Sequence, residues 1–340
     1  MKVSAINQFS GDVEGSARAL RYSLLKLGQK KAINTYSQEL TAHISEALPD
    51  TLCNPRDWVL AFPGTGAGAV PNAIKYVTDT LSSNLNIACV GLGKKDTGTG
   101  DYAAQSKAQR LNNRHIVLDR SRQADIQDKK IILVDDGIAS GVALAKSREV
   151  LERYGEVTAC FVIADFRTSG DPAYERYLNR LVIDLVGPEF YATLLNSEEN
   201  FTTSKLVAYF FEDNRRLRAA IGYLSPTALA NLVFATFIYF KDRASPYLHL
   251  IRNHLKDRQP DMDAAILSRL SGVLTVLTAG VNGGDGQKNQ IFDLLSCHKT
   301  FRLGMKDFDQ ACLDVFSLAP ASSTPSRTDF SNIQGNRVSR

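Results

Sequence analysis

The sequence predicts an α/β protein, in which a doubly wound, mainly parallel sheet is followed by an α-helical domain. In the first two-thirds of the chain, short apolar runs typical of buried strands alternate with stretches of helical periodicity, the pattern of a parallel sheet covered on both faces. From about Asn214 onward strand signals are scarce and helical stretches dominate. We therefore expect a sheet domain over residues 1–215, a helical domain over 216–318 and a polar, disordered tail over 319–340.

The first predicted elements surround one glycine-rich turn. Residues 1–15 are expected to be coil or a short strand. Apolar residues recur at helical spacing from Arg18 to Leu48, which predicts one or two helices with a break at Gly28. The apolar run Trp58–Phe62 predicts a buried strand, and it leads into the turn Pro63–Gly68.

A second strand is predicted beyond the glycine-rich turn. A helix from Ala69 to Leu81 should precede this strand, which spans Asn86–Gly91. The polar segment Gly93–Arg114 has little periodicity and is expected to be a long loop with one helix at most, because long loops in compact domains are usually functional or disordered. His115–Leu118 is expected to be a short strand.

The next stretch has the clearest strand–helix–strand pattern. A buried strand at Lys129–Val134 precedes a helix from Val142 to about Tyr154, and the apolar run Val157–Asp165 predicts the following strand. Arg180–Val186 is expected to add one more. Ser225 and Pro226 are a helix-start signal, and further helices are predicted at Thr227–Lys241, Pro246–Lys256, Met262–Ala279, Gln287–Ser296 and Lys306–Phe316.

Composition narrows the functional class. Of 340 residues, 44% are hydrophobic and 22% charged, which excludes a wholly disordered chain. A net charge of +4, from 40 basic and 36 acidic residues, is too even to indicate nucleic-acid binding. The longest apolar stretch, Leu224–Phe240, is too short and too polar for a membrane span, which needs about 20 apolar residues. Five scattered cysteines without metal-ligand spacing favour a cytoplasmic protein with reduced thiols.

One stretch carries recognisable chemistry. The buried strand Lys129–Val134 delivers Asp135 and Asp136 to its carboxyl end, where ligands bind in open α/β sheets. Carboxylates accept hydrogen bonds from hydroxyl groups and suit Mg²⁺ with its waters. Backbone N–H groups at the following helix start favour an anion, which Gly141 allows to approach closely and to which Ser140 can donate. A phosphorylated sugar satisfies both features.

The stretch Ile131–Ala143 resembles the signature of the type I phosphoribosyltransferases, which binds phosphoribosyl pyrophosphate (PRPP). In that family an apolar run leads into two acids and then into small hydroxyl residues around a glycine. The resemblance implies that Asp135 and Asp136 hold the ribose and act as the catalytic residues. It also implies that the 5′-phosphate is bound by Ala139, Ser140, Gly141, Val142 and Ala143.

The match has two departures from the family pattern. Gly137 stands where a larger apolar residue is usual. Ala139 and Ala143 leave Ser140 as the only hydroxyl side chain of the phosphate loop, so phosphate binding would depend mainly on backbone N–H groups.

Three further segments can be interpreted through the same resemblance. The turn with Gly64, Thr65 and Gly66 stands where the family contacts pyrophosphate, although a plain tight turn is the alternative. Gly93–Arg114 stands where the family has a flexible loop that closes over PRPP, and Gln105–Asn113 resembles that loop in ComF-like domains; a solvated polar loop is the alternative. Closure would bring basic side chains to the departing pyrophosphate: Lys94, Lys95, Lys107 and Arg110. Asp165-Phe-Arg167 either lines a nucleobase pocket or is an ordinary loop.

The resemblance covers residues 15–210 and implies transfer between PRPP and a nitrogenous base. Mg²⁺ would assist, held mainly by PRPP and water and not directly by the protein. Two other classes stay open: a PRPP or nucleotide sensor without catalysis, and an effector of a bacterial antiphage system that binds a protein partner through residues 216–318. We expect a homo-oligomer that binds neither membranes nor nucleic acid.

Overall fold

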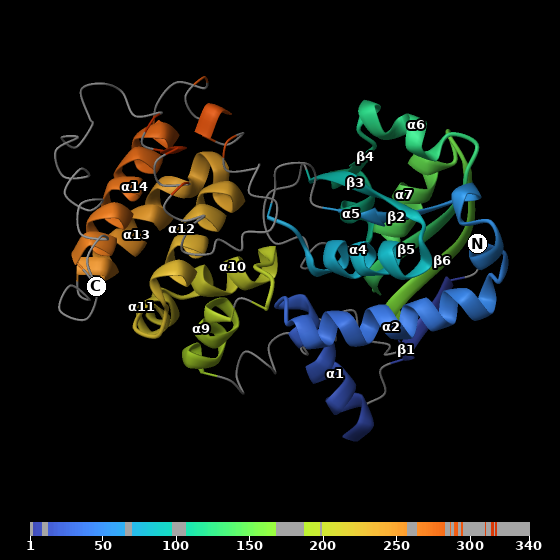
Figure 1. Ribbon diagram of the computed structural model, residues 1–340, viewed down its shortest axis with the longest axis horizontal. Helices are drawn as coiled ribbons and strands as arrows, with labels where there is room; N and C mark the ends of the chain where they lie inside the picture. Colours follow the sequence, from blue (N-terminus) through green and yellow to red (C-terminus); the bar gives the residue numbers. More distant parts are fainter. Residues whose placement is uncertain are drawn as a thin grey trace, which may run out of the picture. The chain divides into compact units, whose positions relative to one another are not determined.

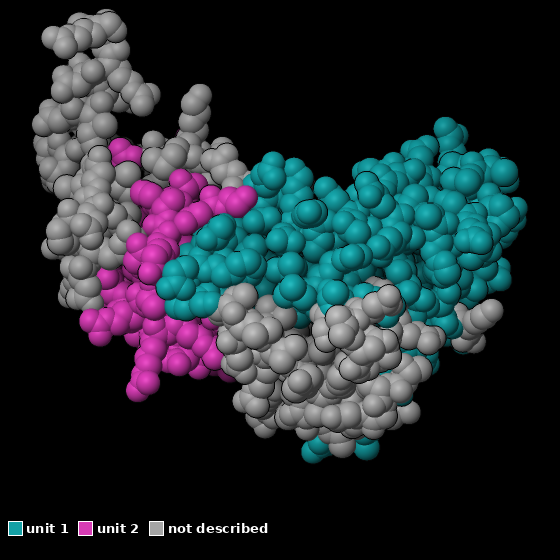
Figure 2. All heavy atoms as spheres, turned by 90° about the horizontal axis from the view of Figure 1, so that it is seen from below, with its two compact units in different colours: residues 1–194, 199–206 teal, residues 195–198, 207–340 magenta. Residues whose placement is uncertain are grey.

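The computed structural model divides the chain into two compact units. One contains residues 1–194 and 199–206, and the other contains 195–198 and 207–340 (Figure 2). The expected strand Arg180–Val186, residues Thr65 and Gly66 and the tail lie outside the residues that the structure describes. Those described are 3–8, 13–64, 70–96, 107–167, 187–197, 199–256 and 264–282, with single positions between 286 and 317.

Within the described residues, six strands form one sheet in the order β1-β6-β5-β2-β3-β4. Every neighbouring pair is parallel except β3 and β4, which are antiparallel. The α/β class and the mainly parallel sheet are therefore confirmed. The strands are β1 (Val3–Gln8), β2 (Trp58–Pro63), β3 (Ala88–Asp96), β4 (Arg114–Val117), β5 (Lys130–Ile138) and β6 (Glu156–Asp165).

Helices cover both faces of this sheet (Figure 1). On one face α1 (Val13–Lys26), α2 (Lys30–Ala47) and α4 (Ala73–Leu85) share a core with alternate strand residues such as Leu60 and Ile132. On the other face α7 (Val142–Leu151) packs on the intervening residues, such as Ile131. Because both sides of each central strand are buried, these strands are apolar throughout instead of alternating. Gly28 separates α1 from α2, as predicted, with φ at +88°.

The winding direction of the chain reverses between β2 and β5. From β2 the chain passes through α4 to β3 on one side, whereas β5 lies on the other side of β2 and continues through α7 to β6. The two crossover helices lie on opposite faces of the sheet. Such a switch point leaves a crevice at the carboxyl ends of the two central strands, where open α/β sheets bind their ligands.

The region expected to be a long loop is partly regular structure. β3 continues to Asp96 because its last residues pair with β4, with Lys94 opposite Ile116 and Lys95 opposite His115. Lys94 and Lys95 therefore lie on a strand and not on a loop, a correction to the sequence prediction. Lys107 and Arg110 lie on a helix, α5 (Lys107–Asn113).

Two helices, α9 (Pro188–Asn196) and α10 (Ser204–Glu212), already precede Asn214, and most of α9 belongs to the first unit. The helix start at Ser225 is confirmed: its Oγ accepts a hydrogen bond from the backbone N–H of Ala228 at 3.2 Å, and Pro226 occupies the first helical position. Further helices are α11 (Asn214–Ile221), α12 (Pro226–Phe240), α13 (Ala244–Lys256) and α14 (Ala264–Asn282). Short helical turns are α3 (Asp50–Cys53), α6 (Gln123–Ile126), η1 (Pro55–Asp57), η3 (Arg120–Arg122) and η5 (Lys241–Arg243).

The second unit packs around α12. Eleven residues of this helix are buried, and α13 and α14 contact it. Among the described residues, no helix combines the length and the apolar character that crossing a bilayer requires.

Candidate ligand-binding site at the carboxyl ends of β2 and β5

The end of β2 and the acidic pair of β5 both lie at the switch point of the sheet. β2 and β5 pair in parallel up to Ala61 opposite Leu133. Pro63 and Asp135 each lie two residues beyond this last pair, near the carboxyl ends of their strands. Segments far apart in the sequence therefore emerge side by side at the carboxyl edge of the sheet, where the sequence placed its candidate ligand site.

The two carboxylates leave β5 on opposite faces, since successive side chains of a strand alternate. Asp136 points to the face covered by α1, where it meets Lys26. Asp135 points to the face covered by α7, and its Oδ1 accepts a hydrogen bond from the backbone N–H of Asp136 at 2.9 Å. Both residues are buried, with 7% and 8% exposure. A ligand at the strand end would meet them from two sides.

The pKa of the Cys160 thiol agrees with the position of Asp135 on the α7 face of the sheet. Cys160 lies on the neighbouring strand β6, opposite Leu133, and belongs to the core on the α7 face. Burial raises the pKa of this thiol to about 12, and the negative charge of Asp135 contributes to the rise. Asp135 therefore lies near this thiol, on the face covered by α7.

Lys26, which sequence reasoning missed, forms a shielded ion pair with Asp136. Its Nζ lies 2.6 Å from Asp136 Oδ2, with side-chain exposures of 19% and 12%, and 5.3 Å from the centre of the Tyr22 ring. The two residues are 110 positions apart. In the sequence Lys26 has only the signature of an ordinary basic residue in the last turn of a helix.

The glycine at position 137 has a steric cause. A Cβ atom there would lie 2.6 Å from the hydroxyl oxygen of Tyr22 and 2.8 Å from Cε2 of Phe166. The two aromatic rings pack edge to face, with centroids 5.4 Å apart. They fill the space that a larger residue at this position would need.

The predicted phosphate loop leads directly into α7. Gly141 is the N-cap of α7, with φ at +73°, and makes no side-chain capping hydrogen bond. The hydroxyl of Ser140 accepts from the N–H of Val142 at 3.5 Å, which is a long contact. Val142 is buried, whereas Ala139, Ser140, Gly141 and Ala143 are half-buried. The N–H groups and dipole of this helix start suit an anion.

The end of β6 adds another charged pair beside β5. Asp165 pairs with Ile138, and its carboxylate accepts two side-chain hydrogen bonds from Arg167, at 2.9 Å from Nε and 2.6 Å from Nη2. These hydrogen bonds lower the pKa of Asp165 and raise that of Arg167. With Asp135 and Asp136 on β5 and Lys26 on α1, three carboxylates and two cations lie around the described ends of β5 and β6.

The other predicted site residues are described only in part. The N–H of Gly64 donates to the carbonyl of Leu92 at 2.8 Å, and the side chain of Asn72 donates to the carbonyl of Pro63 at 3.4 Å. Thr65 and Gly66 lie outside the described residues, as do the side chains of Lys94, Lys95, Lys107 and Arg110. The structure thus brings together Gly64, the acidic pair and the start of α7.

No protein-family model matches this chain, and no curated protein matches it. The fold and the site therefore define the class of this protein: an α/β protein with an acidic pair and a helix start suited to anions at the switch point of its sheet.

Proposed function

We propose that this protein is a PRPP-dependent phosphoribosyltransferase with the type I fold. One observation carries the proposal: the switch point between β2 and β5 brings together Gly64 at the end of β2, the acidic pair and the start of α7. These three features are the ones expected of a site for a sugar that carries a phosphate at one end and a pyrophosphate at the other.

Each feature has a part in binding such a ligand. The backbone N–H groups at the start of α7 would bind the 5′-phosphate, with Ser140 as the one hydroxyl donor. Asp135 and Asp136 would accept hydrogen bonds from the ribose hydroxyls. Gly64, which follows the end of β2, would face the pyrophosphate. Lys26 and Arg167 offset carboxylate charge that would otherwise repel a polyanionic ligand.

The proposed reaction is a displacement at the anomeric carbon of the ribose. The bond from this carbon to pyrophosphate breaks, pyrophosphate leaves with the bonding electron pair, and the nitrogen of the acceptor base forms the new bond. Positive charge develops on the ribose ring, and carboxylates fixed beside the ring stabilise it. The nucleophile belongs to the acceptor, so no nucleophilic side chain of the protein is needed.

Mg²⁺ fits this site best as part of the ligand. Carboxylate oxygens are suitable Mg²⁺ partners, and Asp135 and Asp136 are the carboxylates that would lie near a bound ion at the end of β5. Within the described residues no three His, Cys, Asp or Glu side chains gather as a ligand set. When bound, the ion would neutralise charge on the leaving pyrophosphate.

The first test is ligand-induced stabilisation. A ligand at 100 times its dissociation constant stabilises the folded state by about 2.7 kcal/mol, which corresponds to about 5 to 10 °C in melting temperature for a unit of this size. We expect PRPP with Mg²⁺ to produce such a rise in the wild type and none in Asp135→Asn/Asp136→Asn. Asp125→Asn, which loses only an exposed ion pair with Arg122, is the matched control. A wild type that does not respond contradicts the proposal.

A PRPP sensor without catalysis is the second candidate. It is favoured by Ala139 and Ala143, which leave Ser140 as the only hydroxyl side chain of the phosphate loop. Release of pyrophosphate in a screen of nitrogenous bases separates the two functions, because a sensor would show stabilisation without turnover. Cys53, Cys89 and Cys160 are free thiols, and we place either function in the cytoplasm.

A further inference from the structure

We propose that Lys26 is a positioning residue for Asp136, an inference that rests on the proposed function. The ammonium group holds Oδ2 of the carboxylate and leaves Oδ1 to accept a ligand hydroxyl. Its positive charge also offsets the charge of Asp136 next to the ligand's phosphates. α1, which contributes none of the predicted site residues, thereby becomes part of the ligand site.

The ion pair between Lys26 and Asp136 is less exposed to solvent than an ordinary surface ion pair. The side chains of Lys26 and Asp136 are 19% and 12% exposed, and the distance of 2.6 Å is that of a strong charged hydrogen bond. Withdrawing two charges from water is costly, so a shielded pair stabilises a protein little. Among the described residues, Lys26 is the hydrogen-bond partner of Asp136 Oδ2, and none is found for Oδ1.

The backbone at Lys26 and just after it is hydrogen-bonded to a segment from later in the chain. We call residues 199–204 the brace. The hydroxyl of Thr203 donates to the carbonyl of Lys26 at 2.8 Å, and the N–H of Phe201 donates to the carbonyl of Gly28 at 2.8 Å. At Gly28 a Cβ atom would lie 1.9 Å from the carbonyl oxygen of Phe201, so only glycine allows this approach.

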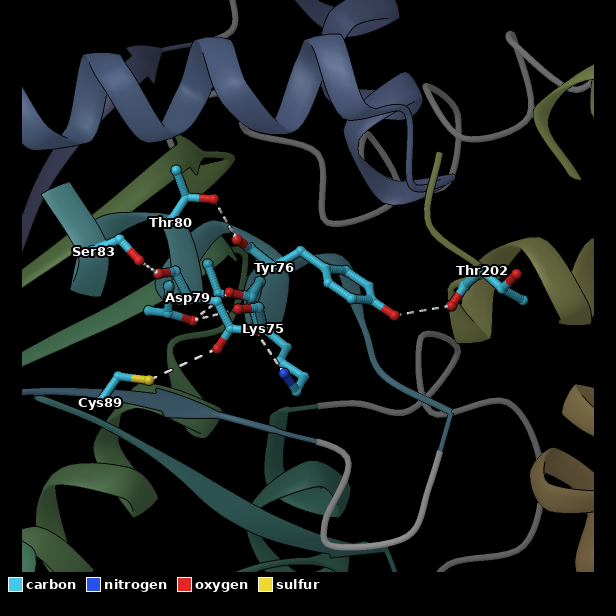
Figure 3. Close-up of polar contacts among 9 residues, drawn as sticks. Lys75, Tyr76, Asp79, Thr80, Ser83, Cys89 and Thr202 are labelled. Carbon is cyan, nitrogen blue, oxygen red and sulfur yellow. Dashed lines mark hydrogen bonds and ion pairs between the residues drawn. The ribbon is translucent and has the colours of Figure 1, made fainter. Parts of the chain in front are cut away.

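The brace also contacts the segment that follows the glycine turn. The N–H of Ser204 donates to the carbonyl of Pro71 at 2.9 Å. The ring of Phe201 stacks on Tyr76 with centroids 4.1 Å apart, and the Tyr76 hydroxyl donates to the carbonyl of Thr202 at 3.3 Å (Figure 3). The brace therefore connects the α1–α2 turn to the first turn of α4. Its hydrogen bond to the carbonyl of Lys26 fixes the backbone from which the Lys26 side chain extends.

Charge explains why a cation is needed at this position. The described ends of β5 and β6 carry Asp135, Asp136 and Asp165, and Arg167 is paired with Asp165. Without Lys26, Asp136 would be a shielded carboxylate with no counter-charge, at the edge where a ligand with several phosphate charges arrives. Like charges brought together in a partly buried site repel strongly.

The test compares Lys26→Met with a matched lysine. Lys75 also forms a 2.6 Å ion pair, with Asp79, and also lies over a tyrosine ring, at 5.7 Å from the centre of Tyr76 (Figure 3). We expect Lys26→Met to weaken the binding of PRPP with Mg²⁺ by about tenfold or more, since a charged hydrogen bond is lost and its partner stays shielded. Lys75→Met should bind PRPP within twofold of the wild type, and Lys26→Arg should retain most of the affinity.

A double-mutant cycle shows whether Lys26 acts through Asp136. In the Asp136→Asn background no carboxylate remains to be positioned, so adding Lys26→Met should change the affinity by less than twofold. This comparison holds even if Lys26→Met alone does not fold, because the double variant contains no unpaired charge. Isothermal titration with PRPP and Mg²⁺ measures each affinity.

The outcomes separate this inference from the proposed function. If the wild type binds PRPP and Lys26→Met binds it equally well, Lys26 has no positioning role and the inference is wrong. A tenfold loss on adding Lys26→Met to Asp136→Asn also overturns it, because Lys26 would then act independently of Asp136. If the wild type itself does not bind PRPP, the proposed function fails and the inference falls with it.

Discussion

Charged side chains at the ends of β5 and β6 form ion pairs, and one of these pairs makes the stability of the protein depend on pH. Arg167 donates two side-chain hydrogen bonds to Asp165 and lowers the pKa of that carboxyl. A carboxyl with a lowered pKa in the folded state stabilises the protein above its unfolded pKa of about 3.9. That stabilisation is lost as the pH falls through the folded pKa.

We therefore predict a pH-dependent loss for Arg167→Gln. Because the Arg167 side chain is 47% exposed, solvent screens the pair and its contribution is about 1 kcal/mol at pH 7. The difference in the free energy of unfolding between wild type and variant should shrink below about pH 3.9 and vanish once Asp165 is protonated in both states. Urea denaturation across this range measures it.

The control for this prediction is Arg148→Gln. Its ion pair with Glu152 lies on the surface of α7, with both side chains 41% exposed, so its loss at pH 7 should be smaller than that of Arg167→Gln. An Arg167→Gln effect that is the same at pH 3 and pH 7 would mean that packing of the arginine, and not the charge of Asp165, is responsible.

Among whole elements, the turn between α1 and α2 depends most strongly on one residue. At Gly28 both the positive φ and the 1.9 Å approach to the Phe201 carbonyl exclude a side chain. We predict that Gly28→Ala lowers the free energy of unfolding by about 3 kcal/mol, the upper end of the usual range for overpacking, because a backbone atom and not a flexible side chain must move. Chemical denaturation followed by circular dichroism measures this loss.

A second glycine provides the matched control. Gly286 has a helical backbone conformation, and a Cβ there would meet nothing within 4 Å. Gly286→Ala should be neutral or slightly stabilising, since alanine is favoured over glycine in helices. Equal effects of the two substitutions would show that the close approach between Gly28 and Phe201 is absent in solution.

The elements themselves were predictable where one local signal dominated. The apolar runs of β2, β5 and β6 and the helix start at Ser225 lie where the sequence predicts them. The extension of β3 to Asp96 was not predictable, because Lys94 and Lys95 are polar and belong to a strand only through pairing with β4. The local pattern at these residues indicates a loop, and a tertiary partner overrides it.

The residues of the candidate site also differ in how far the sequence could predict them. The acidic pair and the start of α7 follow one another in the chain, so a single motif identifies them. Lys26 reaches Asp136 across 110 positions, and the brace reaches Gly28 from the far end of the first unit. Such contacts arise from packing of elements that are separate in the sequence, and no spacing rule along the chain could have indicated them.

For the whole molecule, the two compact units raise the question of whether they unfold separately. The chain has one tryptophan, Trp58, which is buried in the first unit with Lys130 5.2 Å from its ring centre. Trp58 begins β2, whereas the candidate site lies at the other end of that strand, about 16 Å away at the usual rise per residue. Its fluorescence therefore reports unfolding of the first unit and not direct contact with a ligand.

Far-UV circular dichroism reports both units, because the second is built from helices. We predict that PRPP with Mg²⁺ raises the unfolding midpoint seen by Trp58 fluorescence, while part of the circular dichroism signal unfolds at an unchanged temperature, since a ligand stabilises only the unit that binds it. In Asp135→Asn/Asp136→Asn neither signal should move. If both signals instead shift together in the wild type, the two units unfold as one cooperative structure, and binding at the edge of the sheet would then stabilise the helical unit as well.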